Sequence, residues 1–108
     1  MDYQQIVAHM QQVAGVTGAA VVNTDGKFEH TSITDAPAEL SGVAYQIFSN
    51  IAVQIKRMQR GQLRRLVLET EDGITLLSLL AKGELLVVYA SVVEGFNLAS
   101  LIESTTKF

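Results

Sequence analysis

Three short apolar runs separated by two tight turns fill the second half of the chain, and they constrain its fold more than any other feature. The runs cover residues 63–71, 74–81 and 85–91, and each has the length of a strand rather than of a typical helix. The connections at 72–73 (Asp-Gly) and 82–84 (Lys-Gly-Glu) consist of turn-forming residues. The pattern therefore predicts an antiparallel meander of three strands. Because the second connection interrupts the most apolar stretch, neither piece approaches the roughly 20 residues of a membrane helix, and we expect no membrane insertion.

The beginning of the chain predicts a helix followed by a hairpin. Apolar residues recur at helical spacing as far as Ala14, and Gly15 is the expected end of the helix. Asp2 and Gln5 form a variant of the capping box at its start. A continuous apolar run then leads to a Thr-Asp-Gly turn at 24–26, and a segment of alternating character follows. These two segments predict a buried strand paired with a more exposed one.

A long amphipathic helix is expected between the hairpin and the meander. It begins at about Pro37, which suits a first helical turn, and runs to about Arg60, with Gly61 as its C-terminal stop. At 1.5 Å per residue it would span about 36 Å. Its apolar arc covers roughly 200°, about twice what packing on one sheet needs. One face contains Leu40, Val43, Ala44, Ile47, Ile51, Ile55 and Met58, and Tyr45, Phe48 and Ala52 continue it.

The width of this arc has two interpretations. One is a deeply buried helix within a monomer. We predict instead that the flank formed by Tyr45, Phe48 and Ala52 contacts a partner, because so short a chain has no second layer left to cover it. The third strand, from Leu63, is the expected second element of this interface, and the expected product is a stable homodimer.

The end of the chain predicts a short helix, since Leu98, Leu101 and Ile102 lie at helical spacing. Asn97 is a suitable N-cap, and residues 91–94 offer a competing capping box. The predicted order is α-β-β-α-β-β-β-α over a single domain of residues 1–108. The fold class is α/β in the α+β sense: a five-stranded antiparallel sheet with helices on both faces, which buries every apolar stripe.

Composition excludes several classes of function. Hydrophobic residues make up 48% of the chain and charged residues 18%, which argues against disorder and suggests extra buried surface at an interface. The net charge of −3 gives no global attraction to nucleic acid or anionic membranes. There are no cysteines, hence no disulfides, thiolate metal sites or cysteine nucleophiles. The N-terminal residues lack the pattern of a secretory signal, and we expect a cytoplasmic protein.

The spacing of glycines and apolar strands resembles the roadblock family of dynein light chains and small-GTPase regulators. The similar segments are Gly-Val-Thr-Gly-Ala-Ala-Val-Val at 15–22 running into Asp25-Gly26, Leu-Val-Leu-Glu-Thr-Glu-Asp-Gly at 66–73, Leu-Leu-Val-Val-Tyr-Ala at 85–90, and Asn97-Leu98. The family's usual Asn-Leu-Gly ends in Ala99 here. The resemblance implies a homodimer, or a heterodimer with a related roadblock protein. In such a dimer the third strands join into one sheet and the second helices pack side by side. It also implies a non-catalytic adaptor or regulator of a Ras-like small GTPase, or a component of a motor or signalling scaffold.

Five of the eight basic residues lie within ten positions, namely Lys56, Arg57, Arg60, Arg64 and Arg65. Cations favour helix C-termini, and charges on a strand discourage open-ended sheet pairing, so a purely structural interpretation exists. No aromatic residues alternate with them, which argues against nucleic acid. As a functional site, the cluster is best interpreted as a docking surface for an acidic protein partner.

Other polar residues give no recognisable site. His9 and His30 have no third ligand at metal-binding spacing, and Glu69, Glu71 and Asp72 beside a turn are interpreted as solvated. There is no P-loop motif, so any GTP would be bound by the partner. We therefore expect no enzyme activity, metal or cofactor. The alternatives to a GTPase regulator are a structural scaffold protein and a ligand-sensing module, and the latter would need a concave pocket that a packed domain should lack.

Overall fold

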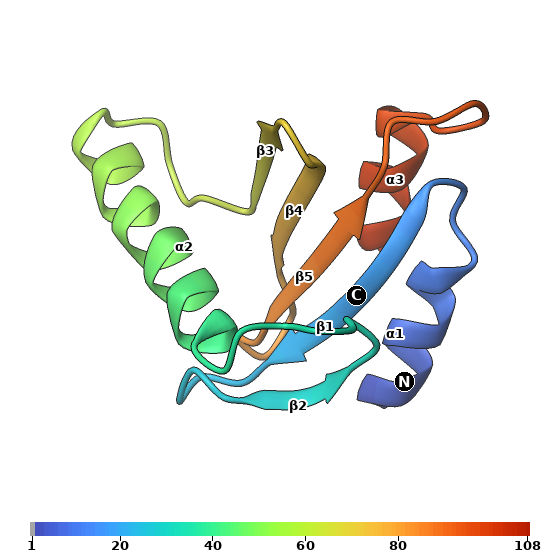
Figure 1. Cartoon of the computed structure of the whole chain (residues 1–108). Helices are drawn as coiled ribbons and strands as arrows, with labels where there is room; N and C mark the ends of the chain where they lie inside the picture. Colours follow the sequence, from blue (N-terminus) through green and yellow to red (C-terminus); the bar gives the residue numbers. More distant parts are fainter. Residues whose placement is uncertain (1) are drawn as a thin grey trace.

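The computed structural model describes residues 2–108, and Met1, which the expected domain also includes, lies outside the described residues (Figure 1). The predicted element order is confirmed. The elements are α1 (Tyr3–Gln11), β1 (Val16–Val22), β2 (Phe28–Thr31), α2 (Leu40–Arg57), β3 (Arg65–Thr70), β4 (Gly73–Leu79), β5 (Leu85–Ala90) and α3 (Leu98–Thr105).

All five strands form one antiparallel sheet with the order β2-β1-β5-β4-β3. The hairpin and the meander are joined by pairing between β1 and β5, their most apolar strands, and Ala20 of β1 lies opposite Val87 of β5. On the other side of β5, Leu77 of β4 also lies opposite Val87. These central strands are buried on both faces, which explains why their sequences are continuously apolar rather than alternating. β2 and β3 are the two edges.

The sheet separates two cores, and helices cover both faces as predicted (Figure 1). Alternation along β5 places Leu86 and Val88 toward α1 and α3, and Leu85 and Val87 toward α2. The core under α1 and α3 is the larger one. Its buried residues are Ile6, Val7, Met10, Ala19, Val21, Ile74, Leu76, Leu80, Leu86, Val88, Ala90 and Leu101.

The starts of α1 and α3 follow the predicted caps, whereas α2 begins at Leu40 rather than at Pro37 and has no side-chain cap. Asp2 Oδ1 accepts from the Gln5 N–H at 2.8 Å, and the Gln5 side chain accepts from the Asp2 N–H at 3.0 Å, which completes the capping box. Asn97 caps α3 by accepting from the Ser100 N–H at 3.0 Å, and the competing box at 91–94 is not used. α1 and α3 therefore begin where their side-chain acceptors fix them.

The helix ends are earlier than predicted. α1 ends at Gln11, because the chain needs the next residues to turn into β1. Gly15 completes that turn with φ +89°, and a Cβ there would lie 2.7 Å from the Phe96 ring. α2 ends at Arg57, because Gln59 adopts the left-handed conformation. The Gln59 N–H then donates to Lys56 O and the Arg60 N–H to Ile55 O, a Schellman motif that closes the helix before Gly61.

Candidate interaction surface

An apolar stripe on α2 faces solvent. Val43, Ile47 and Ile51 are spaced four residues apart and are 42%, 38% and 37% exposed, and Met58 extends the stripe with 66%. Figure 1 shows α2 diverging from the sheet toward its C-terminal end. Accordingly, the residues of α2 that are buried all lie in its first half. In the second half of the helix Ile51 and Met58 are exposed, and Ala52 and Ile55 are only partly buried.

The opposite flank of α2 packs on the chain's own sheet. Phe48 is 7% exposed and Ala44 is 4% exposed, and both belong to the core beside β1, β4 and β5. Tyr45 packs partly against this core, and its hydroxyl donates to Gly83 O at 3.4 Å. Ala52 is half-buried. The expectation that Phe48 contacts a partner is therefore corrected, because Phe48 lies in the intramolecular core. The face of α2 that was expected to lie on the sheet is instead largely exposed, at Val43, Ile47, Ile51 and Met58.

The edge strand β3 is the second open element. Within the described residues it pairs only with β4, so its outer row of N–H and C=O groups has no strand partner. Val67 is 39% exposed on one side of the strand. Leu63, the residue expected at the interface, is half-buried against the core under α2. The open helix stripe and the open strand edge thus belong to consecutive elements of the chain, α2 and β3.

The five basic residues are not gathered into one patch. Lys56, Arg57, Arg60 and Arg64 are exposed around the end of α2 and the connection to β3. Arg65 is different, because its Nε donates to Thr105 Oγ1 at 2.8 Å and so ties β3 to α3 on the opposite face of the sheet. Since consecutive residues of an extended chain point to opposite faces, Arg64 and Arg65 cannot serve one surface. The docking hypothesis is therefore restricted to the first four residues.

The remaining polar candidates lie apart from this surface. His9 packs edge-to-face against the Phe108 ring at a centroid distance of 5.4 Å, and His30 is half-buried on β2. Glu69, Glu71 and Asp72 are exposed. Residues 2–108 contain no cluster of three potential metal ligands. In the same range, no helix is long and apolar enough to cross a membrane.

The structure also contains a polar pair that sequence analysis missed. Glu84, in the connection between β4 and β5, is only 7% exposed, and its Oε2 accepts from the Tyr3 hydroxyl at 2.7 Å. Burial raises the pKa of Glu84, but the Tyr3 hydrogen bond, the nearby N–H groups of Glu84 and Lys82 and the Lys82 charge together leave it below the ordinary value. The same hydrogen bond is the main reason why the pKa of Tyr3 is raised. Glu84 is therefore ionised at neutral pH.

Replacing Tyr3 with phenylalanine is expected to destabilise the protein in a pH-dependent way. The lowered pKa of Glu84 means that its stabilising contribution is present above the ordinary value of 4.5 and is lost as pH falls through the folded-state pKa. Tyr3→Phe removes the donor, so the deficit in unfolding free energy should be largest at pH 7 and shrink in acid. Chemical denaturation between pH 7 and pH 3 measures it. Tyr45→Phe is the control, because its hydroxyl donates to the neutral Gly83 carbonyl and its effect should not depend on pH. A pH-independent deficit for Tyr3→Phe would contradict the assignment.

Comparison with known proteins gives the family. Residues 2–90 match the Roadblock/LC7 domain family. Among solved structures, a Roadblock/LC7 domain from Streptomyces avermitilis is 22% identical with a TM-score of 0.72, and the match covers 99% of this chain and 97% of that one. Myxococcus xanthus MglB is 10% identical with a TM-score of 0.79, covering 99% and 90%. M. xanthus MglC is 19% identical with a TM-score of 0.60, covering 99% and 92%. None of the curated proteins matches the sequence.

These structural likenesses confirm the predicted fold, and the family match covers most of the chain. The resemblance seen in the glycine and strand spacing is thereby confirmed, and this chain is a member of the Roadblock/LC7 domain family.

Proposed function

We propose that this chain is a dimeric, non-catalytic regulator or adaptor that binds a Ras-like small GTPase. The observation that carries the proposal is the uncovered apolar stripe of α2 next in the chain to the unpaired edge of β3. Both features are costly in isolation, since exposed apolar stripes and open strand edges promote association. A partner that covers the α2 stripe and pairs with the β3 edge would remove the apolar surface from water and satisfy the unpaired backbone groups.

A second copy of the chain fits this surface. In a two-fold dimer each surface meets its own counterpart, so β3 would pair with the partner's β3 and α2 with the partner's α2. Such pairing would extend the sheet across the dimer and bury Val43, Ile47 and Ile51. The family membership supports the same arrangement, which the sequence resemblance already implied.

The GTPase would bind the dimer from outside and carry the nucleotide. The chain has no P-loop motif, and the family resemblance points to regulation of such enzymes rather than to nucleotide hydrolysis. Lys56, Arg57, Arg60 and Arg64 are exposed and would steer an acidic partner surface toward the end of α2. In this proposal any effect on hydrolysis arises from repositioning the GTPase's own residues.

Charge reversal tests the docking surface. Arg57→Glu combined with Arg64→Glu should lower the association rate with the GTPase by about tenfold at low salt and reduce its salt dependence. Both residues are exposed, so the fold should persist. Lys27→Glu combined with Lys107→Glu is the matched control, with the same change in net charge at exposed sites elsewhere. An equal loss in both double variants would show that only net charge matters.

The proposal itself is tested by titrating the dimer against small GTPases from the same cell. Binding and hydrolysis are measured in the GDP-bound and GTP-analogue states. Saturable binding in at least one state is the expected result. Failure to bind in either state would leave a structural scaffold as the better account. Exposed Val92 and Val93 beyond β5 would favour that account if light scattering showed assemblies larger than a dimer.

A further inference from the structure

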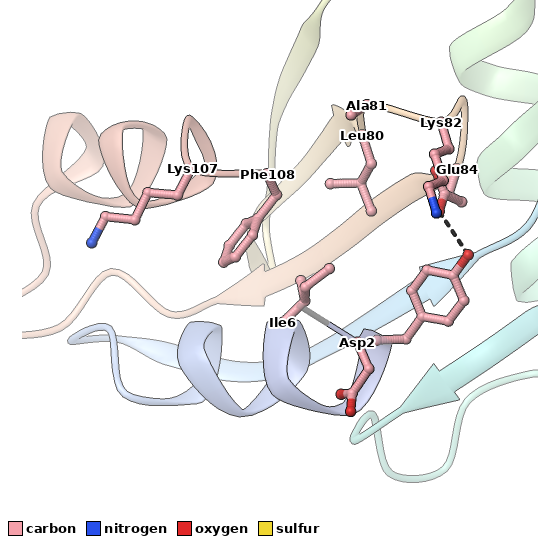
Figure 2. Close-up of a pocket in the computed structure, with 9 residues that line it drawn as sticks. Asp2, Ile6, Leu80, Ala81, Lys82, Glu84, Lys107 and Phe108 are labelled. Atoms are coloured by element: carbon pink, nitrogen blue, oxygen red, sulfur yellow. Dashed lines mark hydrogen bonds between the residues drawn. The ribbon is translucent and has the colours of Figure 1, made fainter.

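A hollow of about 460 Å³ lies on the face of the sheet opposite α2, which corrects the expectation that a packed domain lacks one. Figure 2 shows it between α1 and the connection from β4 to β5, with Phe108 closing one side. The Glu84 carboxylate on its wall already accepts from the Tyr3 hydroxyl, and its other oxygen is buried from solvent. Glu84 is therefore not available to a ligand, and the outer edge of β3 is the stronger recognition feature.

The sequence of β3 is symmetric about Val67. Leu66 and Leu68 flank this residue, and the next residues outward are Arg65 on one side and Glu69 on the other. Apart from the sign of the two charges, the five residues have the same character in either direction. An antiparallel pair of identical strands sets one copy against the reversed copy. Such a pair centred on Val67 would place apolar residues opposite apolar residues and a positive charge opposite a negative one.

The two faces of β3 restrict how it can meet its own copy. Val67 and Glu69 point to the face covered by α1 and α3, because the β4 residues opposite them belong to that core, and Arg65 shares this face by alternation. Leu66 and Leu68 point toward α2. In the proposed dimer both α2 helices lie on one side of the joint sheet, so residues opposite one another must come from the same face. Only a register centred on a single residue satisfies this condition.

Of the three central registers, one matches the side chains. Centred on Val67, the pair places Arg65 opposite the partner's Glu69, and Leu66 opposite the partner's Leu68. Centred on Leu68, it would place Val67 opposite Glu69. Centred on Leu66, it would place Val67 opposite Arg65. The last two registers set an apolar side chain against a charge at the middle of the pair, and cross-strand pairs of that kind are unfavourable relative to matched ones.

The side chains involved are accessible for this pairing. Val67 is 39% exposed and Glu69 is exposed. Arg65 is half-buried, and its Nε donates to Thr105 Oγ1 at 2.8 Å. This bond holds the guanidinium on the face that Glu69 also occupies and leaves its two terminal nitrogens to donate to another acceptor. Because the side chain is already ordered, pairing with a carboxylate costs it less conformational entropy.

We propose that β3 pairs with the β3 of a second copy about a two-fold axis at Val67, and that two symmetric pairs of Arg65 with the partner's Glu69 fix this register. This inference rests on the dimer proposed above and adds what selects its partner. A second copy of this chain supplies a carboxylate opposite each Arg65. A related chain without an acidic residue at that position would leave the guanidinium facing no counter-charge, so the edge favours self-association.

A charge-complementation experiment tests the register. Glu69→Arg and Arg65→Glu each set like charges opposite one another twice in a homodimer, and each should raise the dimer dissociation constant by about tenfold or more. An equimolar mixture of the two variants should form a heterodimer, because both pairs then again join opposite charges. Native mass spectrometry identifies the heterodimer by its mass. Variants that dimerise as the wild type does, or a mixture that stays monomeric, would overturn the proposal.

Glu71→Arg is the matched control, since it makes the same charge change at an exposed residue just beyond β3. It should dimerise as the wild type does. In the register centred on Leu68, Arg65 would instead face Glu71, so a weakened Glu71→Arg dimer that Arg65→Glu rescues would overturn the Val67 register. If Arg65→Glu does not fold, Glu69→Arg is mixed with the wild type. That heterodimer retains one attractive pair and should have a dissociation constant between those of the two homodimers.

Cross-linking measures the register directly, because the chain contains no cysteine. Residues directly opposite one another have Cβ atoms about 5 Å apart, so Val67→Cys should form an intermolecular disulfide on mild oxidation. Two copies of residue 69 would be separated by about 13 Å along the strands, so Glu69→Cys should not cross-link. Efficient cross-linking of Glu69→Cys and not of Val67→Cys would contradict the proposed axis.

The wild-type protein separates failure of this inference from failure of the proposed function. A wild-type chain that is monomeric at micromolar concentration refutes both the dimer and its register. A wild-type dimer whose affinity is unchanged by Glu69→Arg refutes the register alone and leaves the dimer intact. Binding to a GTPase is measured in a separate titration, and its outcome does not enter either comparison.

Discussion

Replacing Phe48 with aspartate is expected to unfold the isolated chain. The Phe48 ring is 7% exposed and packs in the core with Leu77 and Val87. Losing the ring costs about 3–5 kcal/mol, and burying a carboxylate in its place adds to that cost. A domain of this kind has a total stability of about 5–15 kcal/mol. Circular dichroism and thermal denaturation should therefore show the loss of a cooperative transition.

Phe48→Leu is the matched control, because it keeps an apolar side chain at the site and should retain a cooperative transition at lower temperature. This experiment decides between the two flanks of α2. If Phe48→Asp gave a folded monomer, the flank predicted from the sequence would be the dimer contact after all. The intramolecular packing of Phe48 argues for unfolding instead.

Replacing Ile51 with aspartate should have the complementary effect of dissociating the dimer while preserving the fold. Ile51 is 37% exposed within one chain and is absent from both buried cores. In the proposed dimer it lies in the middle of the α2 stripe, where a buried carboxylate without a partner is strongly unfavourable. The dimer dissociation constant should rise by about a hundredfold or more, equivalent to about 3 kcal/mol. Light scattering at micromolar concentration measures the change in mass.

Ser49→Asp provides the control for Ile51→Asp, since Ser49 is an exposed polar residue of the same helix outside the stripe. It adds the same charge and should remain dimeric. A wild-type protein that is monomeric at micromolar concentration, or an Ile51→Asp variant that is still dimeric, would show that the stripe is not the interface.

Local sequence was sufficient for the elements and their order. The turns at Asp72-Gly73 and 82–84 separated the meander, and Asp2 and Asn97 capped the helices as predicted. The uninterrupted apolar character of 19–22 and 85–88 indicated central strands buried on both faces. These signals are local because turns, caps and burial depend on neighbouring residues, and they are consistent with a single topology.

The division of the α2 arc could not be predicted in the same way. A helical projection shows that the arc is too wide for one sheet, but it does not show which flank meets the sheet. That depends on the tilt of the helix, which brings Ala44 and Phe48 onto the strands and carries Ile51 and Met58 away from them. The separation of Arg64 from Arg65, in contrast, could have been predicted from the sequence, because consecutive side chains of an extended segment point to opposite faces.

The sequence alone therefore determined the strands, the helices, their order and the presence of surplus apolar surface, because each depends on residues close together in the chain. Only the tertiary structure decided which side of α2 remains open and that Tyr3 meets Glu84. Those two residues are 81 positions apart, and their contact exists because β1 and β5 pair at the centre of the sheet and bring α1 beside the connection from β4 to β5. Pairings over such distances depend on how the cores pack, and no local pattern encodes them.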